Sequence, residues 1–124
     1  MEYYEHEAIT LLAGLGLKFF RTGSREICRP APTDTDADFV VLGMGRRGGD
    51  LTNFGFTHTN LDTSNDYQDT DIETYRRGEV NLIVVFDKTE FWKWKVATAA
   101  AKQMNIKEKR RRIALFQGVL YGNW

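Results

Sequence analysis

The sequence predicts an α+β fold, in which a small mixed β-sheet packs against helices. Two short apolar runs, at residues 36–42 and 79–86, are rich in β-branched and aromatic side chains and predict buried strands. Apolar residues recur at helical spacing near the N-terminus, and two longer stretches near the C-terminus also predict helices. If the two strands are neighbours, a mixed sheet backed by these helices is the natural packing.

The first third of the chain supplies a helix, a strand and a turn. A helix is expected from Glu2 to Leu15, where Gly14 and Gly16 end the pattern. Residues 18–22 predict a short strand that runs into a turn at Gly23-Ser24. Residues 25–35 hold both prolines and predict a short helical turn followed by a loop, before the strand at 36–42 begins.

The rest of the chain alternates loops with regular elements. We expect a glycine-rich loop at 43–50, a strand at 52–59 and an exposed, aspartate-rich loop at 60–71. After the strand at 79–86, a helix at 89–104 is capped by Asp87 or Thr89. A second helix runs from residue 106 or 107 to Tyr121 and ends at Gly122.

Size and composition limit the functional classes. The 124 residues predict one domain over 1–124, and 42% hydrophobic with 27% charged residues is typical of globular proteins. Seventeen basic and seventeen acidic residues cancel, so any contact with nucleic acid needs a local patch. Cys28 is the only cysteine, which excludes an intrachain disulfide, and no apolar run is long enough to span a membrane. We therefore expect a cytoplasmic protein that does not bind membranes.

Two aspartates and a Gly-Ser turn suggest a nucleotide site. Asp36 and Asp38 are one residue apart, so on a strand their side chains point to the same face. Upstream, Gly23-Ser24 offers backbone N–H groups and a hydroxyl that suit a phosphate. Because Mg²⁺ prefers one or two carboxylates together with substrate phosphates, the pattern predicts that Mg²⁺ and a nucleotide bind here.

The same residues resemble a known family. In the nucleotidyltransferase superfamily (DNA polymerase beta-like), Gly-Gly or Gly-Ser precedes an Asp-x-Asp flanked by hydrophobic residues, as Gly23-Ser24 precedes Asp36-Ala37-Asp38-Phe39 here. Residues 75–84, 94–98 and 112–122 are similar to short nucleotidyltransferase-like proteins of bacteriophages. If the chain is viral, its expected location is the host cytoplasm. Thr22 stands where the family has an aliphatic residue before the glycine.

The resemblance implies a role for each of these residues. Asp36 and Asp38 would be catalytic metal ligands for Mg²⁺, and Gly23 and Ser24 would bind the phosphates of a nucleoside triphosphate. The family's third carboxylate aligns with Asn81, which cannot act as a base or add negative charge. Glu79, two residues earlier on the same strand, is the candidate catalytic substitute, and Asp87 is a weaker one.

Other polar residues have two interpretations. Arg25, Arg76 and Arg77 are candidates for nucleotide phosphates, with solvated surface arginines as the alternative. The basic run 107–112 predicts a solvated helix start or a contact with a nucleic-acid backbone. The aromatic residues at 91, 92 and 94 predict core packing or base stacking.

Three functions therefore stay open. The first is a small Mg²⁺-dependent nucleotidyltransferase that acts on a hydroxyl of a nucleic acid or a protein. The second is a protein with this fold that does not turn over substrate and modulates a partner protein. The third is a small nucleic-acid-binding protein.

Overall fold

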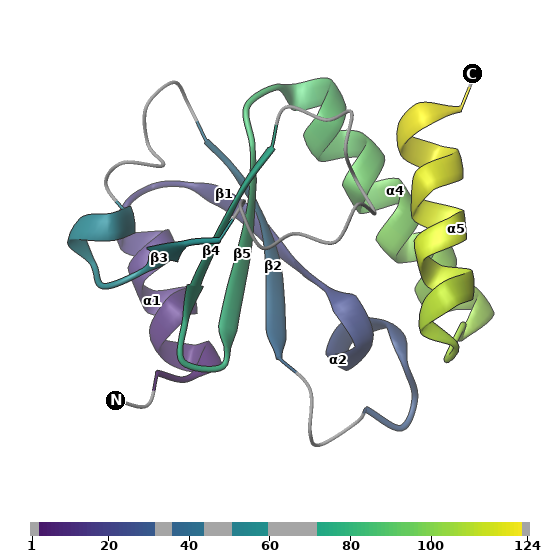
Figure 1. The fold of residues 1–124 in the computed structure, drawn as a ribbon, viewed down its shortest axis with the longest axis horizontal. Helices are drawn as coiled ribbons and strands as arrows, with labels where there is room; N and C mark the ends of the chain where they lie inside the picture. Colours follow the sequence, from purple (N-terminus) through teal and green to yellow (C-terminus); the bar gives the residue numbers. More distant parts are fainter. Residues whose placement is uncertain (1–2, 32–35, 44–50, 60–71, 123–124) are drawn as a thin grey trace.

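In the part of the chain that the structure describes, five strands form one mixed sheet with helices on both faces (Figure 1). The computed structural model describes residues 3–31, 36–43, 51–59 and 72–122. The elements in these ranges are α1 (Glu5–Gly14), β1 (Lys18–Thr22), α2 (Gly23–Ile27), β2 (Ala37–Leu42), β3 (Thr57–His58), β4 (Ile72–Arg77), β5 (Val80–Val85), α4 (Lys88–Met104) and α5 (Lys109–Tyr121). The predicted α+β class is confirmed.

The two strands with the strongest apolar pattern lie at the centre. The sheet order is β1-β2-β5-β4-β3, and β2 and β5 are parallel while every other pair is antiparallel. The central position of β2 and β5 explains their apolar runs, because a strand that is covered on both faces of the sheet needs apolar side chains on both faces. In the parallel pair, Asp38 lies opposite Asn81.

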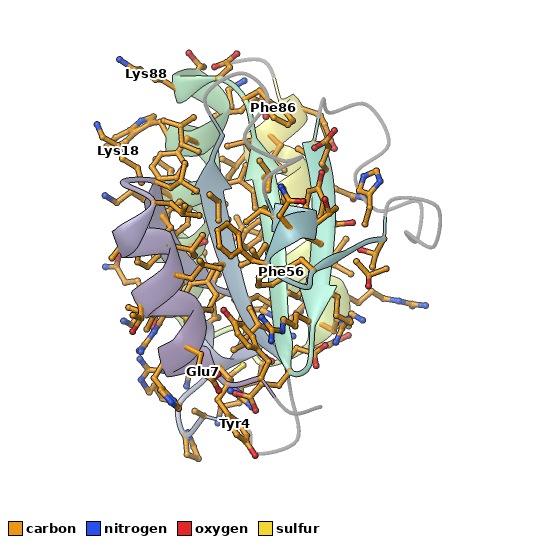
Figure 2. All side chains as sticks on the ribbon, turned by 90° about the vertical axis from the view of Figure 1, so that its left-hand side faces the viewer. Tyr4, Glu7, Lys18, Phe56, Phe86 and Lys88 are labelled. Carbon is orange, nitrogen blue, oxygen red and sulfur yellow. The ribbon has the colours of Figure 1, made fainter. Side chains whose placement is uncertain are left out.

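The first face of the sheet packs against α1 and against the segment around Phe56, which lie in front of the sheet in Figure 2. Phe39 and Leu82 from the central strands pack here with Leu12 of α1, and all three are fully buried. Tyr3 meets Phe56 edge to face at 5.4 Å between ring centroids. This core joins the first face of the sheet to α1.

The second face packs against α2, α4 and α5. Val40 of β2 and Trp94 of α4 are buried here, and the Trp94 ring lies 5.5 Å from the Phe116 ring of α5. The hydroxyl groups of Thr22 and Thr98 are buried and hydrogen-bonded at 2.7 Å, which ties the end of β1 to α4. This face carries the candidate site described below.

The ends of the two C-terminal helices agree closely with the prediction. The Asp87 side chain accepts hydrogen bonds from the backbone N–H groups of Thr89 and Glu90, at 2.6 and 3.1 Å, so the cap of α4 is Asp87. Helix α4 ends at Met104, as predicted, and is capped by Asn105 in the left-handed conformation. Helix α5 begins two or three residues after the predicted start.

The other predicted elements differ in their limits or their type. The N-terminal helix begins at Glu5 rather than Glu2, and the Gly23-Ser24 turn is the first turn of α2. The strand expected at 52–59 is wrong over its first half: residues 51–53 are helical, and β3 is only Thr57–His58. Leu51, the first residue of this helical turn, is buried in the core of the first face.

One strand was not predicted, and two predicted loops lie outside the described residues. β4 pairs along its whole length with β5. Only Thr74 and Tyr75 are buried in β4, so it lacks the apolar run that marks β2 and β5. The loop expected at 60–71 and, apart from Gly43, the loop expected at 43–50 fall outside the described ranges. Within those ranges, no helix is both long and apolar enough to cross a membrane.

Candidate functional site

A row of polar side chains crosses the second face of the sheet. Strand pairing places Thr22, Asp38, Asn81 and Arg76 opposite one another on β1, β2, β5 and β4. Directly opposite residues of neighbouring strands share a face. The row interrupts an otherwise apolar layer, because Val40 and Ile83, two residues further along β2 and β5, pack against the core of this face. Such a polar row next to a packed core is a candidate binding site.

Gly23 and Asp38 approach each other closely. A Cβ atom added to Gly23 would overlap Oδ2 of Asp38, so no side chain fits between them. Gly23 also has a φ of +76°, a conformation that glycine adopts without strain. The local sequence thus brings the first turn of α2, with Ser24, against the carboxylate of Asp38.

The carboxylate of Asp38 is poorly solvated. Burial raises its pKa from the ordinary value to about 6, although a hydrogen bond from the Asn81 amide acts in the opposite direction. The nearby negative charge of Asp36 raises the pKa further. A cation bound at this carboxylate would offset the same burial, because it would stabilise the charged form.

Asp36 is paired with an arginine. Nη2 of Arg76 lies 2.7 Å from Oδ2 of Asp36, and this hydrogen bond lowers the pKa of the Asp36 carboxyl. Both side chains are almost half exposed, so the pair contributes little to stability. Arg76, singled out from the sequence as a phosphate ligand, therefore lies at the site, where it neutralises one of the two aspartates.

Glu79 and Arg25 form a separate ion pair. Glu79 lies in the turn between β4 and β5, and its Oε2 is 3.0 Å from Nη1 of Arg25. This hydrogen bond lowers the pKa of Glu79, and the backbone N–H of Glu5 also donates to it. Arg25 lines a small cavity beside Asp38, whereas Glu79 lines no described pocket with the aspartate pair.

Arg77 lies on the opposite face from its neighbour Arg76, because strand side chains alternate. Its guanidinium is 4.1 Å from the centre of the Tyr3 ring and donates to the Phe54 carbonyl at 2.6 Å. These contacts give Arg77 a structural role. The structure does not bring it together with Asp36 and Asp38.

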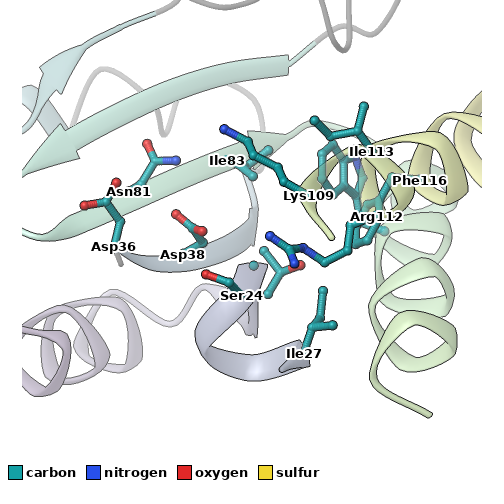
Figure 3. A pocket seen from close by; sticks show the side chains of 13 residues that line it. Ser24, Ile27, Asp36, Asp38, Asn81, Ile83, Lys109, Arg112, Ile113 and Phe116 are labelled. Atoms are coloured by element: carbon teal, nitrogen blue, oxygen red, sulfur yellow. The ribbon is translucent and has the colours of Figure 1, made fainter. Parts of the chain in front are cut away.

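The polar row opens into a pocket of about 460 Å³ between the sheet, α2 and α5. Figure 3 shows Asp36, Asp38 and Asn81 on one wall, while Lys109 and Arg112 extend from α5 toward them. The lining comprises Thr22, Gly23, Ser24, Ile27, Asp36, Asp38, Asn81, Ile83, Trp94, Lys109, Arg112, Ile113 and Phe116. It joins an acidic wall, a basic wall and an apolar floor.

Only some residues of the basic run at 107–112 line the pocket, and only some of the aromatic residues at 91, 92 and 94 are buried in the core. Lys109 and Arg112 line the pocket, whereas Lys107, Arg110 and Arg111 are exposed outside it. Trp94 is buried, which confirms core packing, and the partly buried Phe91 packs on the same core. Trp92 is 63% exposed. The buried Trp94 ring is therefore unavailable for stacking on a base.

The residues present fit a hard divalent cation. Asp36 and Asp38 give two carboxylates on one wall, and the Asn81 amide keeps a carbonyl oxygen while its nitrogen donates to Asp38. Mg²⁺ is bound in this way, by one or two carboxylates and substrate oxygens. Among the described residues, no group of three or more His, Cys, Asp or Glu side chains forms a protein-only metal cage.

Comparison of the chain with protein-family models, curated proteins and solved structures found no match. The assignment of a function to the pocket therefore depends on its residues alone. Sequence reasoning identified the aspartate pair, Gly23, Ser24 and Arg76, but not the pocket position of Lys109 and Arg112. The spacing of these two residues, three apart on a helix, gives a shared face without showing what that face meets.

Proposed function

We propose that this protein binds a nucleoside triphosphate together with Mg²⁺ in the pocket between β2, α2 and α5. The observation that carries the proposal is the pair of aspartates on one wall of the pocket, Asp38 on β2 and Asp36 just before it, which face the first turn of α2 across the close Gly23–Asp38 approach. Asp36 and Asp38 would hold the metal, and the Ser24 hydroxyl and neighbouring backbone would contact phosphate oxygens. The resemblance to nucleotidyltransferases supports the same assignment.

The apolar part of the pocket suits the rest of a nucleotide. Ile27, Ile83 and Ile113 line it beside the polar row. Nucleotide sites commonly combine an apolar surface for the base with a few fixed polar groups for the phosphates. The pocket therefore offers both kinds of contact on adjoining walls.

Nucleotidyl transfer is the second candidate function, and the pairing of two carboxylates favours it. The oxygen of an acceptor hydroxyl would bond to the α-phosphorus, the bond to the bridging oxygen would break, pyrophosphate would leave, and the proton would pass to solvent. When bound, two Mg²⁺ ions supply charge stabilisation for the attacking and leaving oxygens of such a displacement. The amide of Asn81 in the third position argues for binding without turnover, since it cannot serve as a base.

Isothermal titration tests the binding proposal. The wild-type protein is titrated with each of the four ribonucleoside triphosphates, once with Mg²⁺ and once with EDTA. We expect Mg²⁺-dependent binding of at least one triphosphate, and its loss in the variant Asp36→Asn with Asp38→Asn. Equal affinity in this double variant would refute the site.

A second assay separates binding from transfer. Pyrophosphate release is followed in the wild type and in Asn81→Asp, with nucleic acids carrying free hydroxyl ends as acceptors. Sustained release by the wild type establishes transfer. Tight binding without release, together with a gain of release in Asn81→Asp, establishes a silent site.

A further inference from the structure

The wall of the pocket that faces the aspartates is basic. Lys109 and Arg112 are the two members of the run at 107–112 that line the pocket, and they lie in the first turn of α5. Figure 3 shows both side chains extending from α5 toward the strands that carry Asp38 and Asn81. The geometry of the helix therefore places Lys109 and Arg112 inside the pocket and the other basic residues of the run at 107–112 outside it.

Lys109 and Arg112 differ from the other basic residues around the site because they do not form ion pairs with the described carboxylates. Arg76 pairs with Asp36, Arg25 with Glu79 and Lys102 with Glu26. Across residues 3–31, 36–43, 51–59 and 72–122, no carboxylate forms an ion pair with Lys109 or Arg112. The basic wall thus carries positive charge that the described acidic residues do not neutralise locally.

The guanidinium of Arg112 makes hydrogen bonds that hold the basic wall in place. Its Nη1 donates to the main-chain carbonyl of Lys107 at 2.7 Å and to that of Ile106 at 3.3 Å, and it lies 3.4 Å from Sγ of Cys28. Cys28 follows directly after α2, so these contacts join the start of α5 to the end of α2. They fix the basic wall against the helix whose first turn carries Ser24.

Lys109 differs from Arg112 in its contacts. Within the part of the chain that the structure describes, its ammonium has no hydrogen-bond or ion-pair partner, and its side chain is exposed on the pocket side of the helix. A flexible ammonium with three donors suits a phosphate oxygen whose position is set by other groups.

We propose that Lys109 binds a phosphate of the nucleotide that lies beyond the reach of the aspartate wall, and that the pocket therefore selects a polyphosphate over a monophosphate. This inference rests on the proposed function. A single phosphate held at Asp36, Asp38 and Ser24 would meet only one wall. A chain of two or three phosphates would extend across the pocket and carry its remaining charge to Lys109.

The test compares Lys109 with its neighbour Arg110, which is exposed on the same turn but lies outside the pocket. Wild type, Lys109→Gln, Lys109→Arg and Arg110→Gln are titrated with the tightest-binding nucleoside triphosphate and with its monophosphate, in Mg²⁺. Where the monophosphate binds weakly, its affinity is measured by competition with the triphosphate.

We expect Lys109→Gln to weaken the triphosphate about tenfold or more, the usual effect of losing one charged hydrogen bond, and the monophosphate less than about twofold. Lys109→Arg should stay within about threefold of wild type, and Arg110→Gln should be unchanged. Both Gln variants should melt at the wild-type temperature, because both side chains are exposed.

Two results would overturn the inference while leaving the proposed function intact. One is an unchanged triphosphate affinity in Lys109→Gln although the double aspartate variant has lost binding. The other is an equal loss for triphosphate and monophosphate, or an equal effect of Arg110→Gln, which would indicate a general charge effect. Absence of any nucleotide binding by the wild type would overturn both proposals together.

Discussion

Asp38 on β2 and Asn81 on β5 lie directly opposite each other in a parallel strand pair, and the Asn81 amide donates a hydrogen bond to the Asp38 carboxylate. The amide satisfies an oxygen without neutralising its charge, so burial still raises the pKa of Asp38 to about 6. The polar row is therefore stable with a proton or a cation at this carboxylate, and less stable without either.

The metal-free protein should become less stable as the pH rises from 4 to 7. The pKa of Asp38 is about 6 in the folded state and close to 3.8 in the unfolded state, so the folded state binds more protons between these values. The stabilising contribution is complete below pH 4 and is lost as the pH passes 6. The loss amounts to at most about 3 kcal/mol, from the difference in pKa.

Urea unfolding in EDTA at several pH values measures this loss. The difference in unfolding free energy between wild type and Asp38→Asn isolates the contribution of Asp38, since the amide does not titrate. Parallel pH profiles for the two proteins would show that the Asp38 carboxylate is ordinarily solvated.

Replacing Arg76 with Gln should change metal and nucleotide affinity in opposite directions. Arg76 lies 2.7 Å from Asp36 and competes with a cation for that carboxylate. Its removal should raise Mg²⁺ or Mn²⁺ affinity about two- to fivefold, in proportion to an exposed ion pair. The same change should weaken a bound triphosphate about tenfold by removing a guanidinium beside the phosphates.

Lys102→Gln is the matched control for Arg76→Gln, because Lys102 forms a similar exposed ion pair, with Glu26 at 2.8 Å, and lines neither pocket beside Asp38. Metal titration and nucleotide titration of both variants give the four affinities required. Affinities that change in the same direction in Arg76→Gln would indicate that Arg76 does not contact phosphate.

A single methyl group at Gly23 should disturb both the fold and the site. Gly23→Ala places a Cβ where it overlaps Oδ2 of Asp38 and forces alanine into a φ of +76°. The combined strain and crowding should cost about 2–5 kcal/mol in unfolding free energy. Metal affinity should fall as well, because Asp38 must move away.

Gly118→Ala serves as the comparison for Gly23→Ala. Gly118 lies in α5 with nothing within 4 Å of an added Cβ, so alanine there should stabilise the protein by about 0.5–1 kcal/mol. Chemical denaturation of both variants tests the pair. A loss of less than about 1 kcal/mol in Gly23→Ala would show that the close approach is relaxed in solution.

The buried hydroxyl pair of Thr22 and Thr98 should respond unequally to substitution by valine. Thr98 also donates to the Trp94 carbonyl at 2.9 Å, so Thr22 must be the donor in their shared hydrogen bond. Thr98→Val leaves that donor unpaired and should cost about 1–3 kcal/mol. Thr22→Val removes the donor and leaves an acceptor, which should cost less.

The double variant completes the cycle for this pair. Thr22→Val with Thr98→Val should be less destabilising than the sum of the two single variants, because neither buried hydroxyl remains. Thermal and urea unfolding of the four proteins measure the coupling. Additive effects would mean that the two hydroxyl groups do not interact.

The sequence predicted those parts of the fold whose signal is local. The apolar runs at 36–42 and 79–86 mark strands buried on both faces, and Asp87 marks a helix cap. β4 was not predicted, since only Thr74 and Tyr75 of its six residues are buried and its pairing with β5 is a tertiary effect.

The candidate site was also predictable only where its signal is local in the sequence. Alternation along a strand is enough to place Asp36 and Asp38 on one face. The partners of Arg76 and Glu79, and the approach of Lys109 to the pocket, depend on how strands and helices far apart in the chain pack together. No spacing rule within a single element contains that information.

The parallel pairing of β2 with β5 has a consequence for how the protein folds and how it can be studied. The two strands are separated by a long stretch of chain, so their contact closes a large loop and forms late compared with the local β4–β5 hairpin. Since the candidate site spans this pair, no fragment that lacks either strand can contain it. A ligand bound there should slow amide hydrogen exchange throughout the sheet, because opening the site requires cooperative unfolding of the central strands.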